Sequence, residues 1–394
     1  MPRKVWLLVI AMVINVTGAS FLWPFNTIYI HNHLGKSLSV AGMALLINSL
    51  AGVVGNLVGG IMFDKMGGYT SILSGILITL SAVTGLVFFH DWPLYVVWLG
   101  IIGLGAGMVF PSMYAMVGAV WPEGGRRAFN AMYIGQNVGV AVGSALGGLV
   151  ASFRIDYIFL ANLTLYFVFF MIALISFKDM QINVDKVETK VEKASWKLTP
   201  SLQALLVMCI AYAICWIAYV QWQVTISAHM QDLDISLRAY SLLWTVNGAL
   251  IVLAQPVVTA FIRRFNRSLK QQILIGTSIF IVSFLVVGQA EQFSMFMTGM
   301  LILTIGEMFV WPAVPTIANE LAPEGKIGFY QGVVNSAATG GRMLGPWMGG
   351  LIVDLYNIQV LFMVLMAMLL IAMVATSLYD YKLKEKQTKE KIAV

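Results

Sequence analysis

The chain has 394 residues, of which 59% are hydrophobic and only 11% carry a charge. Soluble domains typically carry about 25% charged residues, so this composition excludes a soluble protein. The net charge of +6 would suit a nucleic acid or an acidic partner, but the positions of the basic residues, described below, indicate another origin for it.

Apolar windows bounded by Pro, Gly and charged residues predict twelve membrane-spanning helices. Each window is long enough to cross a hydrocarbon core of about 30 Å as a helix. In chain order the predicted helices cover 5–29, 39–63, 70–90, 93–120, 128–152, 157–177, 201–227, 238–262, 271–290, 293–320, 327–353 and 357–379. An even number of spans places both termini on the same side of the membrane.

The basic residues gather on one side of this predicted topology. Twenty of the 24 Lys and Arg residues lie at the termini and in the loops on their side, whereas only Lys36, Arg154 and Arg238 lie on the opposite side. Because basic residues resist translocation, we expect cytoplasmic termini in a multi-pass protein of the cell membrane. The positive charge is therefore a topology signal, and no nucleic-acid partner is expected. The first apolar segment is too long for a cleavable signal peptide.

A polar segment rich in Lys, Glu and Asp divides the chain into two halves. It covers 178–200, so the predicted domains are an N-terminal six-helix bundle (1–177), a cytoplasmic linker (178–200), a C-terminal six-helix bundle (201–380) and a cytoplasmic tail (381–394). The expected fold class is an all-α membrane protein with twelve transmembrane helices in two pseudo-symmetric six-helix bundles.

The two halves also repeat each other in sequence. At an offset of 201, Gly105, Pro111 and Pro122-Glu123-Gly124 match Gly306, Pro312 and Pro323-Glu324-Gly325, and at an offset of 202 Gly147-Gly148 matches Gly349-Gly350. Two matches centred on one linker indicate duplication. Duplicated membrane bundles are typical of secondary transporters, in which the halves rock about a substrate site near the midplane.

Residues suited to catalysis or metal binding are scarce. The four histidines lie at or near predicted loops, and no pair has metal-ligand spacing with a carboxylate or thiol. Cys209 and Cys215 are six residues apart in one apolar helix and lack a C-x-x-C pattern, so they are expected to fill the core. We therefore expect no enzyme activity, no cofactor and no metal site.

The segment between the second and third predicted helices resembles motif A of the major facilitator superfamily, G-x-x-x-D-[RK]-x-G-[RK]-[RK]. Gly60, Asp64, Lys65 and Gly67 match it, whereas Gly68 and Tyr69 stand where two basic residues are usual. The resemblance implies that these four matching residues form a conformational switch. A carboxylate at this helix end can accept hydrogen bonds from the free N-terminal amides of another helix, which in this fold would be the eleventh.

The fifth predicted helix is similar to motif C of the twelve-helix drug:proton antiporter branch of that superfamily. It carries Gly139, Gly143, Ser144, Gly147 and Gly148, with Ser144 in the place of the usual proline. Small residues at this spacing allow close helix packing, and a second interpretation is a hinge that seals the outer gate. The arginine usual in the fourth helix of this branch is replaced by Leu99.

Further resemblance to multidrug exporters of this branch runs through most of the chain. It implies that the acid of the tenth helix is retained as Glu307, whereas acids expected in the fifth and seventh helices appear here as Met132 and Gln223. A transporter without those two acids would have a simpler proton path and would not favour cations.

Two charged residues, Glu307 and Arg342, are predicted near the middle of the membrane. An unpaired charge there costs roughly 2.5 kcal/mol or more, so both should face protein or water. We predict that they couple transport to protons, with Glu307 exchanging a proton as access alternates. Two other interpretations are a static ion pair that locks neighbouring helices, and an arginine that anchors an anionic substrate group with Glu307 as its resting partner.

Amides and aromatic rings near the same depth predict a cavity that could hold amphipathic molecules. For any single tryptophan, packing or an interfacial belt is the favoured explanation, and the prediction rests on the set as a whole. The predicted lining residues are Asn15, Trp23, Tyr114, Tyr133, Gln136, Asn137, Gln221, Trp222, Gln223, Trp244, Asn247 and Trp311.

These features together predict a secondary active transporter that exports lipophilic or amphipathic small molecules in exchange for protons by alternating access. The alternatives are a transporter of a specific polar or anionic metabolite and a lipid or glycolipid flippase. The expected partners are a small-molecule substrate, protons and the lipid bilayer. We expect a monomer, because one chain of this fold encloses a complete pathway.

Overall fold

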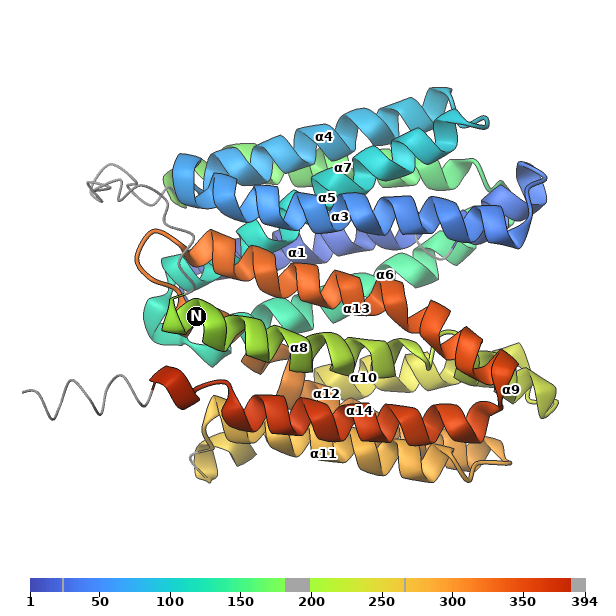
Figure 1. Cartoon of the computed structure of the whole chain (residues 1–394). Coiled ribbons are helices and arrows are strands. Elements are labelled where there is room, and N and C mark those ends of the chain that lie inside the picture. The colour runs from blue at the N-terminus through green and yellow to red at the C-terminus, as the bar shows by residue number, and fades with distance from the viewer. Residues whose placement is uncertain (23–24, 181–198, 266, 384–394) are drawn as a thin grey trace, which may run out of the picture. The chain divides into compact units, whose positions relative to one another are not determined.

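The computed structural model describes residues 1–22, 25–180, 199–265 and 267–383, and these form helices joined by short turns (Figure 1). The predicted fold class is confirmed, since the described residues form an all-helical structure with twelve long helices. By length and hydropathy, eleven helical stretches of the described residues qualify as membrane spans. The remaining long helix, Ile327–Leu355, carries Arg342 and Asp354 and many glycines, which lower its hydropathy.

The first compact unit comprises Met1–Lys190 and Pro323–Ser336. Within it, α5 packs against α3 and α4, α1 packs against α6 and α7, and α4 packs against α7. Short elements are α2 (Asn26–Ile28), a π-helix at Tyr29–His33 and 3-10 turns at Pro122–Gly124 and Lys178–Met180. The long helices are α1 (Arg3–Leu22), α3 (Leu38–Met66), α4 (Gly68–Phe88), α5 (Leu94–Val120), α6 (Arg126–Phe153) and α7 (Tyr157–Ser176).

The second unit comprises Val191–Ala322 and Ala337–Val394, so α13 (Ile327–Leu355) begins in the first unit and continues into the second. Within the second unit, α12 packs against α8, α10 and α11, and α14 packs against α8 and α11. Its other helices are α8 (Pro200–Val220), α9 (Thr225–Asp232), α10 (Leu237–Arg264), α11 (Leu269–Val287), α12 (Phe293–Leu321) and α14 (Ile358–Leu378).

The predicted spans agree with these helices within a few residues, except at two ends. The first predicted span runs to residue 29, whereas α1 ends at Leu22. The seventh runs to residue 227, whereas α8 ends at Val220 and a turn precedes α9. In that turn the amides of Trp222 and Gln223 bond to carbonyls three residues earlier, which tightens the backbone and breaks the α-helical ladder. An apolar sequence does not reveal such a turn. The linker beyond Met180 and the tail beyond Leu383 lie outside the described residues.

Contacts between glycines reproduce the sequence repeat inside each unit. A Cβ atom at Gly105 of α5 would lie 2.7 Å from the carbonyl oxygen of Gly75 in α4. A Cβ atom at Gly306 of α12 would lie 2.8 Å from the carbonyl oxygen of Gly276 in α11. Both members of each pair are related by the offset of 201. The two units therefore share the same close approach of backbone between consecutive helices.

The glycines that resemble motif C make a second repeated contact. A Cβ atom at Gly139 of α6 would lie 2.7 Å from the Val13 carbonyl oxygen of α1, and one at Gly341 of α13 would lie 2.6 Å from the Ala213 carbonyl oxygen of α8. Gly143 continues the contact with α1 one turn further along. In this structure the small residues allow close packing of helix pairs, and a role as an outer hinge stays a prediction.

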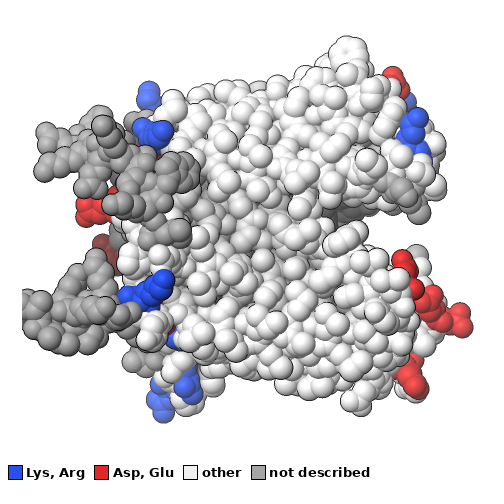
Figure 2. Space-filling view, in the orientation of Figure 1, with Lys and Arg blue, Asp and Glu red and all other residues white. Residues whose placement is uncertain are grey.

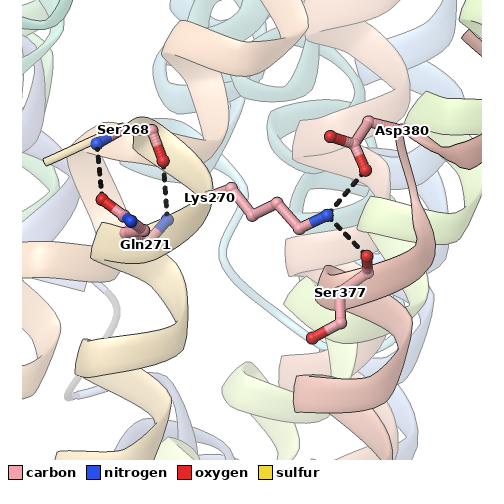
Figure 3. Close-up of polar contacts among 5 residues, drawn as sticks. All are labelled: Ser268, Lys270, Gln271, Ser377 and Asp380. Carbon is pink, nitrogen blue, oxygen red and sulfur yellow. Dashed lines mark hydrogen bonds and ion pairs between the residues drawn. The ribbon is translucent and has the colours of Figure 1, made fainter. Parts of the chain in front are cut away.

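A polar clasp joins one end of α11 to the end of α14 in the second unit (Figure 3). Ser268 and Gln271 form a capping box that starts α11. Lys270 Nζ donates to Asp380 Oδ1 at 2.6 Å and also to the carbonyl oxygen of Ser377. On the face drawn in Figure 2, charged side chains lie at helix ends and uncharged residues form the surface between them.

Candidate transport site

Glu307 is the central acid of the second unit. It lies midway along α12, and only 1% of its surface is exposed. Asn247 Nδ2, from α10, donates to Glu307 Oε1, and Trp311 Nε1 donates to Oε2 at 3.0 Å. The same Asn247 amide donates to Thr304 Oγ1 at 2.9 Å. The carboxylate is therefore held by side-chain donors from two helices, as a polar group at this depth requires.

Aromatic rings from α8 enclose the neighbouring Trp311. Its ring stacks on Trp216 with centroids 4.5 Å apart and planes 11° apart. Tyr212 and Tyr219 each meet Trp311 edge-on, with centroids 5.6 Å apart. The spacing of positions 212, 216 and 219 places all three side chains on one face of α8. Sequence analysis missed this cluster, although the helical spacing of the three α8 residues indicates that their rings share one face of that helix.

Arg342, midway along α13, lies over the ring of Trp216. Its guanidinium carbon is 4.7 Å from the ring centroid, and its Nη2 donates to Thr339 Oγ1 at 3.4 Å. Ion pairs among the described side chains include Arg154 with Asp156 and Lys270 with Asp380. Arg342 contacts Thr339 and Trp216, whereas Glu307 contacts Asn247 and Trp311, so the static Glu307–Arg342 ion pair considered from the sequence is not among these described contacts.

Of the other residues predicted to line a cavity in the second unit, two are buried and two are partly exposed. Gln221 is buried and donates to the carbonyl oxygen of Gly345 at 2.8 Å, which joins α8 to α13. Trp222 is fully buried, and its carbonyl oxygen accepts from Tyr240 Oη. Trp244 and Gln223 remain partly exposed. Trp244 lies close to the aromatic cluster because it meets Tyr219 edge-on at 6.0 Å.

The remaining predicted lining residues belong to the first unit. Tyr114 Oη donates to Gln136 Oε1 at 3.2 Å, which joins α5 to α6. Asn137 Nδ2 donates to the carbonyl oxygen of Tyr133 at 2.9 Å, and Asn15 of α1 is buried. Trp23 lies outside the described residues. A cavity that draws on both units stays a prediction.

Asp64 forms a second candidate site near the end of α3. Its Oδ1 accepts from the amide of Gly328 and its Oδ2 accepts from the amide of Phe329, both at 2.7 Å. These are free amides in the first turn of α13, where the helix dipole favours a negative charge. Gly60 permits the approach, because a Cβ atom there would lie 2.3 Å from the Gly328 carbonyl oxygen.

The other two matching residues of this motif have separate positions. Gly67 ends α3 with a φ of 84°, a conformation that favours glycine. Lys65 is exposed. The repeat does not extend to this site, since the offset of 201 places Phe265 at the position equivalent to Asp64.

Comparison with known proteins agrees with this architecture. Residues 8–339 and 204–393 match the model of the Major Facilitator Superfamily, and the chain belongs to that family of multi-pass membrane transporters. It is 56% identical over 395 residues to the uncharacterized MFS-type transporter YttB of Bacillus subtilis (strain 168), with all of both chains covered. It is 22% identical to the multidrug resistance protein MdtH of Klebsiella pneumoniae (strain 342), with 89% of this chain and 86% of that protein covered.

Among solved structures, a bacterial homologue of the iron transporter ferroportin shares the fold. Its TM-score is 0.81 at 14% identity, and the match covers 96% of this chain and 100% of that chain.

Proposed function

We propose that this transporter exports amphipathic small molecules from the cell in exchange for protons, by alternating access. The observation that carries the proposal is Glu307, an acid buried midway along a membrane-spanning helix and surrounded by aromatic rings. Relatives that include a multidrug resistance protein support export of amphipathic molecules. The excess of basic residues on one side supports insertion in the cell membrane with both termini cytoplasmic.

Glu307 can carry the proton because its two forms suit different surroundings. A carboxylate in hydrocarbon is costly, so the charged form needs donors such as Asn247 and Trp311 or contact with water. The protonated form is neutral and tolerates an apolar enclosure. In the proposed cycle, the acid takes up a proton when its pathway opens outward and releases it when the pathway opens inward.

Asp64 supplies the proposed conformational latch. Two charge-assisted hydrogen bonds attach it to the first turn of α13, whose later residues carry Arg342. Because α13 passes from the first unit into the second, release of this contact would free the helix to shift during the cycle. Gly60 and Gly67 shape the latch, and Lys65 would contribute charge beside it.

In each unit, residues predicted to line a cavity could offer surface to a substrate. Trp244 of the second unit is a partly exposed aromatic ring, and Tyr114 and Gln136 of the first unit supply a hydroxyl and an amide. Such a surface suits molecules with both apolar and polar parts.

Proton-driven transport in proteoliposomes tests the proposal. With an acidic lumen, the wild-type protein should accumulate ethidium or carboxyfluorescein against its gradient. Glu307→Gln should abolish that accumulation but retain exchange of dye down its gradient, since the amide cannot give up a proton. Glu320→Gln, an exposed acid on the same helix, is the matched control and should transport normally. Unchanged uphill accumulation in Glu307→Gln would reject the coupling role.

A further inference from the structure

We propose that Arg342 is the substrate anchor and that it binds the carboxylate or sulfonate of an aromatic anion. This inference rests on the proposed transport function and specifies its substrate class. Two charged residues of the second unit lie midway along helices, and their surroundings differ. Glu307 is buried and accepts hydrogen bonds, whereas Arg342 is exposed.

The guanidinium has unused binding capacity. An arginine presents five N–H donors in a planar fork that matches a carboxylate. Among the described residues, Arg342 has a single hydrogen-bond acceptor, the Thr339 hydroxyl at 3.4 Å, and no carboxylate within ion-pair distance. Arg342 lies midway along α13, and no described carboxylate is paired with it, so a bound anion would supply its counterion.

The side chain is also held in position for an incoming anion. Trp216 contacts both the Arg342 guanidinium, 4.7 Å from its ring centroid, and the Trp311 ring, with centroids 4.5 Å apart. A guanidinium stacked on an indole keeps its N–H edges free, and the stack limits the rotamers it would lose on binding. The geometry is that of a preorganised oxyanion receptor.

The aromatic rings near Arg342 indicate what kind of group the bound anion would carry. Trp216 and Trp244 are partly exposed, and each contacts Tyr219, so they offer ring surface near the guanidinium. Rings of this kind favour an aromatic body attached to the anion. The positive charge would disfavour lipophilic cations, because Glu307 is engaged by Asn247 and Trp311 and does not form an ion pair with Arg342.

Equilibrium binding to the purified full-length protein tests the inference. The probes are carboxyfluorescein, an aromatic carboxylate, and ethidium, an aromatic cation, each followed by fluorescence anisotropy. Wild-type protein should bind carboxyfluorescein more tightly than ethidium. Arg342→Gln should weaken carboxyfluorescein binding by about tenfold or more without weakening ethidium binding, as expected for loss of a bidentate charge-assisted contact.

Two further variants separate chemistry from misfolding. Arg342→Lys retains the charge but loses the planar fork, so its affinity should fall between wild type and Arg342→Gln. Trp216→Phe keeps a ring beneath the guanidinium and should retain most of the affinity, whereas Trp216→Ala should lose it. Each variant should elute from size-exclusion chromatography in detergent as folded protein. If Arg342→Gln or Trp216→Ala does not, the comparison uses Arg342→Lys or Trp216→Phe in its place.

The outcomes distinguish this inference from the proposed function. Carboxyfluorescein affinity within twofold of wild type in Arg342→Gln, or tighter wild-type binding of ethidium than of carboxyfluorescein, overturns the anion site. Both results leave proton-coupled transport intact if Glu307→Gln still abolishes uphill accumulation. Retained uphill accumulation in Glu307→Gln overturns the proposed function whatever Arg342 binds.

Discussion

Trp311 lies one helical turn after Glu307 on α12 and donates its indole N–H to the carboxylate at 3.0 Å. Trp311 also stacks on Trp216, and the Trp216 ring in turn contacts the Arg342 guanidinium. One indole therefore contacts both the proposed proton carrier and the platform of the proposed anion anchor. A rotation of Trp311 would change both sites together.

The two roles of Trp311 can be separated by substitution. Trp311→Phe keeps a ring against Trp216 but removes the N–H donor, and a hydrogen bond to a charged group contributes about 1.5–3 kcal/mol. We expect proton-driven accumulation to fall by about tenfold while carboxyfluorescein binding stays near wild type. Trp347→Phe, at a tryptophan of α13 that is 68% exposed, is the control. Unchanged accumulation in Trp311→Phe would contradict a role for the donor.

Asn247 and Glu307 should be energetically coupled. Asn247→Leu leaves the buried carboxylate without one of its donors, which costs about 1–3 kcal/mol, so the melting temperature of the purified protein should fall. In a Glu307→Met background the same substitution should have a smaller effect, because no carboxylate remains to be satisfied. A double-mutant cycle on melting temperature measures the difference. Equal effects in both backgrounds would mean that the contact contributes nothing.

The Asp64 latch should protect two backbone amides. Asp64→Asn removes the charge and replaces one of the two accepting oxygens with a donor, so the amides of Gly328 and Phe329 lose support. We expect their hydrogen exchange, followed by mass spectrometry, to accelerate about tenfold or more. Asp91→Asn makes the same change at an exposed aspartate of the first unit outside this motif and should leave the exchange unaltered. Equal exchange in Asp64→Asn and wild type would argue against a latch at this point.

The repeated glycine contacts predict matched defects in the two units. Gly105→Ala and Gly306→Ala each add a Cβ atom that overlaps backbone of the adjacent helix, so both should lower folded yield and melting temperature. Gly340→Ala has nothing within 4 Å of the added atom and should be neutral or slightly stabilising. If only one of the two variants lowers the folded yield and melting temperature, the two repeated contacts do not contribute equally to stability.

The clasp between α11 and α14 should stabilise the second unit modestly. Lys270 and Asp380 are partly buried, with side-chain exposures of 23% and 18%, so we expect Lys270→Gln to cost about 1 kcal/mol in stability. The loss should appear in melting temperature and shrink at high salt. Exchange of the two charges in a Lys270→Asp, Asp380→Lys double variant should recover part of it, and no recovery would indicate that the Ser377 carbonyl contact dominates.

The fold could be predicted from the sequence because each span is limited by its own length and hydropathy. The site could be predicted only in part. Glu307 and Arg342 stand out because charges are rare at this depth, but their partners depend on side-chain directions across helices. The Trp216–Trp311 stack needs the crossing of α8 and α12, which no pattern in a single helix specifies. Gln221 is predicted to line a cavity, but its side chain donates to α13 and so joins α8 to that helix. A contact of this kind also depends on the packing of two helices.

The glycine contacts between α4 and α5 and between α11 and α12 have a mechanical consequence. Where glycines bring two helix backbones this close, the tight packing leaves little room for sliding, so each helix pair should move as one rigid body. Whatever motion carries cargo across the bilayer must then be absorbed elsewhere, at the few joints where longer side chains or turns remain between helices. The tight turn after Val220 is one such joint.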